Sequence, residues 1–282
     1  MRIDSHHHFW NFDTKEYAWI DDSMSTLKRD FTMASLQPEL TQSGVEGVIS
    51  VQARQSVEET QWLLELAAEH KQIWGVVGWV PLAQSEDKLC PLLDRLSRQP
   101  LLKGVRHVIQ DEPDERFMLR NDFSQGVALL QRYDLVYDIL IYARQLPPAV
   151  ALVDRHPNQR FVLDHIAKPT IEPPEFDTNW AENLRQLAKR PNVACKFSGV
   201  VTEIQATNWS LEQLQPYWDV ALEAFGPERL MFGSDWPVCL LRSRYDQWVS
   251  TVEALAQTLS VTERARFWAG TAQHWYQLTP RV

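Results

Sequence analysis

Short apolar runs alternate with longer amphipathic stretches along most of the chain. Eight of the short runs have the character of strands, and they lie at residues 2–8, 45–52, 73–80, 102–108, 135–142, 160–166, 193–199 and 229–236. The longer stretches between them, such as residues 57–70 and 209–225, repeat apolar side chains with helical spacing. This alternation predicts βα units arranged around a parallel sheet.

The length of the chain fits one closed barrel of such units. The chain has 282 residues, and an α/β barrel commonly needs about 250. With 44% hydrophobic and 23% charged residues it has ample material for a large core. No linker, repeat or low-complexity tract divides it. We therefore predict a single α/β domain over residues 1–282, folded as a (β/α)8 TIM barrel.

Two segments without a clean period follow predicted strands. These are residues 9–31, rich in aromatic and charged side chains, and the proline-rich residues 169–174. Both are expected to be loops over the mouth of the barrel. Residues 261–278 are expected to form one or two closing helices.

Charge and composition narrow the class of partner. A net charge of −9 disfavours a nucleic-acid surface, so a small-molecule partner is expected. Cys90, Cys195 and Cys239 suggest neither a disulfide framework nor a cysteine zinc site. No export signal or membrane-spanning run is visible, which predicts a cytoplasmic location and no membrane contact. The pattern does not indicate an oligomeric state.

Reactive side chains cluster at the end of the first predicted strand. Because side chains alternate along a strand, His6 and His8 share a face and His7 takes the other. Catalytic groups of α/β barrels gather at the carboxyl ends of strands, so two imidazoles converge there. A chance histidine run and the remnant of an expression tag are the alternatives.

The sixth and eighth predicted strands also end in reactive groups. His165 is expected to share a face with Leu163, whereas Asp164 points away. Asp235 lies at the strand rim just before Pro237, and an ordinary helix-capping aspartate is the alternative. Together with the histidines of the first strand, these groups predict one pocket.

The motifs around these residues resemble the amidohydrolase superfamily. The resemblance is closest to amidohydrolase-related family 2, in its branch of sugar-acid lactonases and dicarboxylate-lactone hydrolases. The matching segments span nearly the whole chain: Asp-x-His-x-His at residues 4–8, Val-Gln-Ala at 51–53 with Glu59 downstream, Lys-Gly-Val-Arg-His at 103–107, Leu-Asp-His at 163–165, Lys-Phe-Ser-Gly at 196–199 and Gly-Ser-Asp-Trp-Pro at 233–237.

The resemblance implies hydrolysis of a lactone, the cyclic ester of a sugar-derived acid such as an aldonolactone. Asp235 would take a proton from the attacking water and later return one to the leaving alcohol, which is work for a positioned carboxylate. The carbonyl oxygen gains negative charge in the transition state and needs a donor nearby. His165, Arg106 and His107 are the candidates for that donor.

His6, His8 and Asp235 also form a candidate metal site. Two imidazoles and a carboxylate suit one divalent ion, zinc or manganese. Members of the superfamily with a firmly held metal usually add a histidine from the end of the fifth strand. No histidine occurs at residues 137–142, so a metal-free mechanism stays open.

Substrate recognition is assigned to further residues at strand ends. They are Arg106, His107, Gln52, Lys196 and Trp236. Adjacent strand positions face opposite ways, so only one of Arg106 and His107 can point directly inward. Trp10, Trp19 and Trp79 are further candidates to line the pocket, although core packing is the ordinary role of tryptophan.

Two other functions stay open beside the lactonase. A metal-dependent decarboxylase of the same superfamily would release carbon dioxide without net ester cleavage. A non-catalytic small-molecule binder would bind without turnover. Ring size and stereochemistry of a lactone depend on loop contacts that the pattern does not reveal.

Overall fold

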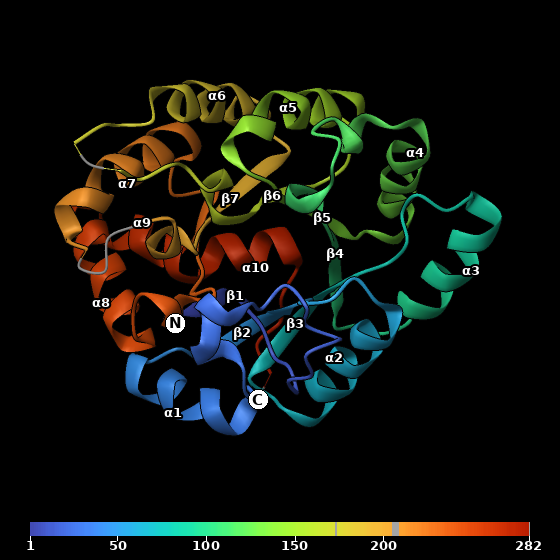
Figure 1. The fold of residues 1–282 in the computed structure, drawn as a ribbon, viewed down its shortest axis with the longest axis horizontal. Coiled ribbons are helices and arrows are strands. Elements are labelled where there is room, and N and C mark those ends of the chain that lie inside the picture. Colours follow the sequence, from blue (N-terminus) through green and yellow to red (C-terminus); the bar gives the residue numbers. More distant parts are fainter. Residues whose placement is uncertain (173, 205–208, 282) are drawn as a thin grey trace.

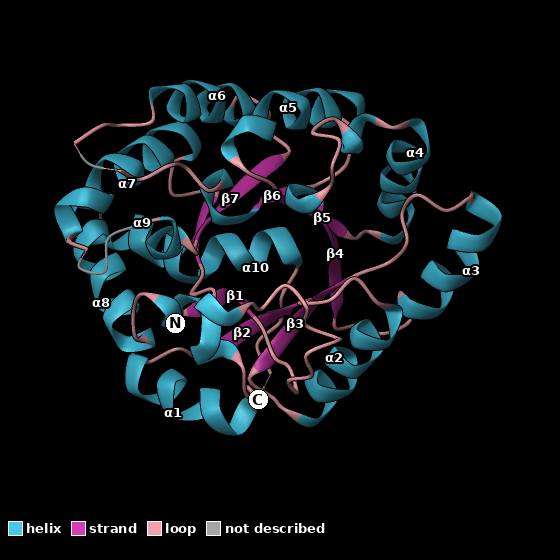
Figure 2. Ribbon diagram, viewed as in Figure 1, coloured by secondary structure: helices cyan, strands magenta, loops and turns pink. Residues whose placement is uncertain are grey.

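The computed structural model describes residues 1–172, 174–204 and 209–281, and it shows a barrel of parallel strands surrounded by helices (Figures 1 and 2). In the described part of the chain, eight strands pair in sequence order and every neighbouring pair is parallel. The strands are β1 Ile3–His7, β2 Gly47–Val51, β3 Ile73–Gly78, β4 Leu102–Val108, β5 Val136–Leu140, β6 Phe161–Leu163, β7 Val193–Phe197 and β8 Leu230–Phe232. The predicted TIM barrel is confirmed.

Helices follow the strands and cover the outside of the barrel (Figure 2). They are α1 Met33–Ser43, α2 Val57–Glu69, α3 Glu86–Leu96, α4 Asn121–Leu130, α5 Leu146–Arg155, α6 Thr178–Ala188, α7 Leu211–Phe225, α8 Tyr245–Leu255, α9 Val261–Ala265 and α10 Thr271–Tyr276. The predicted helices at 57–70 and 209–225 correspond to α2 and α7. A serine precedes each helix: the Ser56 hydroxyl accepts from Glu59 N at 3.0 Å, and Ser210 N donates to Gln213 Oε1 at 2.9 Å. None of the described helices is long and apolar enough to cross a membrane.

The barrel closes between β8 and β1 through bonds that lie beyond the last residue of β8. Asp235 N donates to His6 O at 2.8 Å, and His8 N donates to Trp236 O at 2.7 Å. The Asp4 carboxylate accepts from Ser234 N at 2.8 Å. The segment that follows β8 is therefore fixed to the histidine-bearing end of β1.

The end of the chain closes the opposite, amino-terminal end of the barrel. Trp275, Tyr276 and Leu278 belong to the same apolar cluster as the inward side chains of the strands, such as Ile49 and Val162. Figure 1 shows α10 at the centre of the ring of strands. The prediction that residues 261–278 form closing helices is confirmed by α9 and α10, which are joined by a π-helical turn over Arg266–Gly270.

The segment 9–31 covers the mouth of the barrel, as expected. Trp10 and Phe31 pair through their backbones at 3.0 and 2.8 Å, and the Trp10 indole donates to Arg29 O. A short 3-10 helix at Asp22–Leu27 lies between Trp10 and Phe31. Pro173, part of the other predicted loop, lies outside the described residues.

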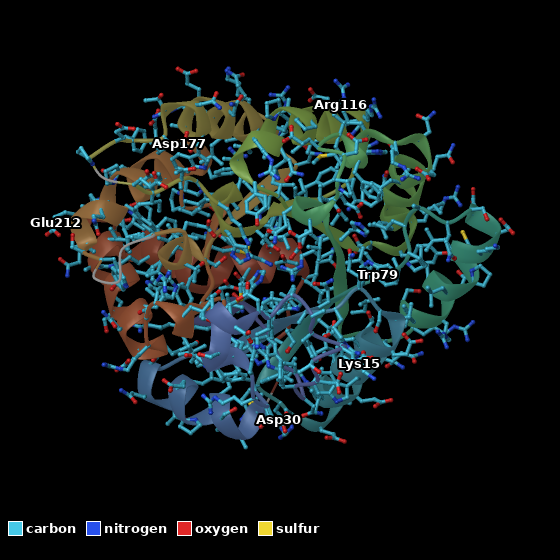
Figure 3. All side chains as sticks on the ribbon, in the orientation of Figure 1. Lys15, Asp30, Trp79, Arg116, Asp177 and Glu212 are labelled. Atoms are coloured by element: carbon cyan, nitrogen blue, oxygen red, sulfur yellow. The ribbon has the colours of Figure 1, made fainter. Side chains whose placement is uncertain are left out.

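Charged side chains such as Asp30 and Glu212 lie at the outer edge of the molecule (Figure 3).

Candidate active site

A cavity of about 600 Å³ lies at the carboxyl ends of the strands. Nearly buried groups form its deep wall, and they are His8, Gln52, Arg106, His165 and Asp235. More exposed residues form its rim, including Glu16, Trp19, Met24, Arg54, Gln55, Gln110, Tyr142, Lys168 and Val238. Such a concave site with a few converging polar groups suits a small molecule.

Three atoms with lone pairs converge beside this cavity. His6 Nε2 lies 3.2 Å from His8 Nε2 and 3.7 Å from Asp235 Oδ1, and His8 Nε2 lies 3.3 Å from the same oxygen. Ligand atoms about 2.0–2.1 Å from a tetrahedral zinc would be about 3.3 Å apart. The separations of the three atoms therefore fit a divalent ion.

The hydrogen bonds behind the two imidazoles set their tautomers. His8 Nδ1 lies 2.8 Å from Val51 O, and because a carbonyl only accepts, this nitrogen carries the proton. His6 Nδ1 lies 3.3 Å from Asp164 Oδ1, and because a carboxylate only accepts, this nitrogen carries the proton and leaves a lone pair on Nε2, 3.3 Å from Arg106 Nη1. Two imidazole lone pairs thus face one carboxylate oxygen, an arrangement that a cation relieves.

Asp235 is held in an ionised state inside this cluster. Its backbone takes a φ of 59°, which turns the carboxylate into the barrel after β8 has ended. Burial opposes ionisation, but the neighbouring His165, His8 and His6 together hold the pKa of Asp235 below its ordinary value. Asp235 is therefore a carboxylate at neutral pH.

His165 reaches the cluster through an unusual turn. Four successive residues, 165–168, have φ between 47° and 62°, a left-handed conformation that costs about 1–2 kcal/mol for each residue with a side chain. The His165 Nε2 atom lies 3.9 Å from Asp235 Oδ1, and its Nδ1 lies 2.9 Å from Ser198 Oγ. Burial lowers the pKa of His165 to about 4, which keeps the imidazole neutral at pH 7.

This turn corrects the expectation for Asp164. The strand β6 ends at Leu163, one residue before Asp164, and the left-handed turn replaces strand alternation from His165 onward. Asp164 points into the barrel, where its Oδ2 accepts from Arg106 at 2.9 Å. The expectation that Asp164 points away was wrong because strand alternation places Asp164 on the same inward face as Val162, whereas His165 reaches the cluster only through the left-handed turn.

Arg106 is fixed by its neighbours on both sides. Its Nη2 donates to Gln52 O at 2.6 Å and to Gln52 Oε1 at 2.7 Å, while Nη1 donates to Asp164. Gln52 in turn donates to Arg54 O. Arg106 therefore presents a rigid positive charge to the cavity, with no rotamer freedom to lose when a ligand binds.

The sequence profile of the amidohydrolase family matches residues 3–278. The chain belongs to the amidohydrolase family. An L-fucono-1,5-lactonase of Burkholderia multivorans is 44% identical over 99% of this chain and 96% of its own length. An L-fucono-1,5-lactonase of Burkholderia ambifaria is 34% identical over the same shares.

A solved structure matches this amidohydrolase closely. A Burkholderia multivorans amidohydrolase with bound zinc superposes with a TM-score of 0.94 at 43% identity, covering 99% of this chain and 100% of that one. The same fold occurs in a protein of Acinetobacter baumannii described as a probable 2-pyrone-4,6-dicarboxylic acid hydrolase, at 15% identity and a TM-score of 0.77 over 98% of this chain and 99% of that one. The buried cluster of His6, His8 and Asp235 indicates a divalent metal site in this chain as well.

Lys196 lies inside the amidohydrolase barrel, away from the cavity wall. Its Nζ is fully buried, 2.6 Å from Asp138 Oδ2 and 3.0 Å from Asp164 Oδ1. Tyr276 of α10 donates to the same Asp138 carboxylate at 2.8 Å. Both of its charge partners lie inside the protein, so Lys196 lies behind the residues that line the cavity.

His107 and Trp236 also lie off the cavity wall. Because Arg106 points inward, His107 faces outward, where it stacks on Phe117 and bonds Glu112 Oε1 at 2.7 Å. The Trp236 ring is 2% exposed and packs edge-on against Phe31. Neither side chain is among the described residues that line the cavity.

Several wall residues were missed in the sequence. These include Tyr142 and Lys168, whereas Trp19 lines the cavity as the sequence had suggested. Strand alternation offered a signal for Tyr142, because it continues the inward positions of Asp138 and Leu140 beyond the end of β5. No periodic pattern marks Lys168, which lies at the end of the left-handed turn.

Proposed function

We propose that this amidohydrolase opens the lactone of a sugar-derived acid by hydrolysis, with Asp235 and His165 as catalytic residues. The observation that carries the proposal is the meeting of Asp235, His8, His165 and Arg106 in one cavity wall. The full-length relatives that are L-fucono-1,5-lactonases support it, and they point to L-fucono-1,5-lactone as the first substrate to test.

The reaction requires water to attack the lactone carbonyl and the ring carbon–oxygen bond to break. Asp235 is ionised and faces the cavity, so it takes the proton of the attacking water and delivers one to the departing ring oxygen. His165 is neutral and donates or accepts a hydrogen bond beside it. The net products are an aldonate carboxylate and a proton.

The carbonyl oxygen gains charge as the water adds. Arg106 lies in the same wall and provides a fixed positive charge for it, with Gln52 holding the guanidinium in place. A divalent ion, zinc or manganese, held by His6, His8 and Asp235 would polarise the carbonyl and lower the pKa of a bound water. A neutral His165 beside an ionised Asp235 also serves the metal-free alternative.

The rim suits a polyhydroxylated ring. Glu16, Gln55 and Gln110 offer donors and acceptors for hydroxyl groups, and Trp19 offers an aromatic face. Met24 and Val238 add an apolar part to the rim. This mixture fits a neutral sugar lactone better than a flat aromatic acid, which is why we place the lactonase before a decarboxylase.

The test follows acid release with a pH indicator over a panel of sugar lactones that includes L-fucono-1,5-lactone. The wild type is expected to accelerate opening of particular lactones, and Asp235→Asn is expected to lower kcat by about 10²- to 10⁴-fold. Asp219→Asn, on the exposed face of α7, is the matched control and should retain full activity. Equal rates for the wild type and Asp235→Asn would contradict the proposal, as would release of carbon dioxide instead of acid.

A further inference from the structure

Lys168 is a cation of the cavity wall that has no role in the proposed reaction. Its side chain lines the cavity together with His165 and Asp235. In the described ranges of the chain, its ammonium makes no hydrogen bond or ion pair. Its visible contact is with the face of the Tyr142 ring, with Nζ 5.5 Å from the ring centroid.

The other cavity cations are already paired with the protein. Arg54 forms an ion pair with Glu16 and lies near Glu59. Arg106 donates to Gln52 and Asp164. A cation such as Lys168 that lacks a protein partner inside a pocket is free to pair with a ligand.

The backbone holds Lys168 in a fixed position. It ends the left-handed turn that begins at His165, and its N–H donates to His165 O at 2.8 Å. Between them Ile166 is fully buried, and its carbonyl accepts from the Trp180 indole at 2.6 Å. Lys168 and the catalytic His165 are therefore carried by one rigid turn.

Glu203 is the carboxylate that could compete for Lys168. Burial raises the pKa of Glu203, and the charge of Lys168 opposes this rise only in part. No hydrogen bond or ion pair joins the two side chains in the described structure. Glu203 therefore leaves Lys168 available to a ligand in the cavity.

Lactone opening creates a negative charge in this cavity. The substrate is neutral, whereas the product is a carboxylate once the ring ester is broken and a proton leaves. We propose that Lys168 binds this carboxylate, so that the site holds an aldonate more tightly than an uncharged polyol of the same shape. The inference rests on the proposed lactone hydrolysis, and it assigns Lys168 to the charged group of the product.

The test measures equilibrium binding of sodium L-fuconate and of uncharged L-fucitol by titration calorimetry. Lys168→Met is expected to weaken L-fuconate binding about ten- to hundred-fold, the size of a lost hydrogen bond to a charged group. Binding of L-fucitol should stay unchanged. Added salt should weaken L-fuconate binding to the wild type more than to Lys168→Met. Lys168→Arg, which keeps the charge, should retain most of the affinity.

Arg144→Met is the matched control. Arg144 also stacks on the Tyr142 ring, 4.7 Å from its centroid, but it is exposed, pairs with Glu115 and does not line the cavity. This variant should bind L-fuconate like the wild type. Equal losses in Lys168→Met and Arg144→Met would overturn the proposal, because they would point to support of the ring rather than to charge.

The outcomes separate this inference from the proposed function. If the wild type opens lactones and Lys168→Met keeps its affinity for L-fuconate, the role of Lys168 is wrong and the lactonase stands. If L-fuconate binds through Lys168 but no lactone is opened, the binding role stands and the proposed reaction fails. A wild type that does not bind L-fuconate contradicts the role of Lys168.

Discussion

Gly199 shows how little space separates the catalytic groups. Its φ is +64°, and a Cβ on this residue would lie 2.6 Å from His165 Nδ1 and 3.0 Å from Asp235 Oδ2. Both distances are shorter than ordinary contacts. The absence of a side chain at Gly199 is therefore what allows His165 and Asp235 to approach each other.

We predict that Gly199→Ala separates these two groups and lowers kcat/KM at least about a hundred-fold, as misplacement by about 1 Å can do. Gly44→Ala is the control, because Gly44 has the same φ of +64° with nothing within 4 Å of its added Cβ. Both variants should lose about 1 kcal/mol of stability from the left-handed backbone. Lactone kinetics and urea unfolding of both variants check this, and full activity in Gly199→Ala would contradict it.

Sequence reasoning was strongest for residues on regular strands. His6 and His8 were expected on one face of β1, and the 3.2 Å between their Nε2 atoms confirms it. It was weakest at the end of β6, where the inward face was assigned to Leu163 and His165 although Val162 and Asp164 occupy it, and where Lys168 was missed. Alternation describes an extended backbone only, and of residues 165–168 only His165 is of a type enriched at positive φ.

At the scale of elements, the loop between β2 and α2 links the buried carboxyl of Glu59 to the cavity wall through hydrogen bonds. Glu59, in the first turn of α2, accepts from Ala53 N at 3.0 Å and from Arg54 N at 2.7 Å. The loop it holds includes Gln52, which fixes Arg106. Glu59 therefore secures the backbone on which the arginine of the site depends.

Glu59 also predicts a pH dependence of stability. Burial raises its pKa from 4.5 to about 7, with the backbone N–H of Arg54 opposing. A carboxyl whose folded pKa is raised favours the folded state at low pH, and this contribution is lost as the pH rises from about 4.5 through 7. At 1.36 kcal/mol for each pKa unit, the contribution of Glu59 to the free energy of unfolding that is lost over this interval is about 3 kcal/mol.

Urea unfolding between pH 4.5 and 8 tests this contribution. The free energy of unfolding of the wild type should fall, relative to that of Glu59→Gln, as the pH rises through 7. Glu58→Gln, on the exposed side of the same helix turn, should follow the wild type. Parallel curves for the wild type and Glu59→Gln would show that the carboxyl titrates alike in the folded and unfolded chain.

The sequence predicted the elements themselves more securely than their ends. All eight strands lie within the predicted runs, but β6 and β8 are only three residues long, against seven and eight predicted. The residues that follow these two strands are buried although several of them are polar, among them Asp164, His165, Ser234 and Asp235. The predicted runs therefore extended past the residues that form strand hydrogen bonds.

At the scale of the whole molecule, the proposed metal site joins the first strand to the segment after the last one. His6 and His8 come from β1 and Asp235 follows β8, so a bound ion would tie the two edges of the barrel together. An ion that binds only the folded chain raises its stability by mass action. The stability of the folded chain should therefore rise with its metal content.

We predict that removing divalent ions with a chelator lowers Tm and that zinc or manganese restores it. His8→Gln should weaken metal binding by more than about a hundred-fold, since changes behind the ligands alone cost ten- to a hundred-fold. His274→Gln, exposed on α10, should respond like the wild type. Differential scanning fluorimetry and calorimetric titration with zinc check this, and an equal Tm rise in His8→Gln would contradict it.

The position of α10 has a consequence for biosynthesis. A ribosome makes His6 of β1 long before Tyr276 of α10, yet both sit in one interior, linked through Asp138 and Lys196. Until α10 and Leu278 emerge, the inner faces of the strands lack the cover of Trp275 and Leu278. The nascent chain therefore carries an open barrel whose apolar lining is exposed to chaperones and to other chains, and termination before α10 leaves the barrel open at its amino-terminal end.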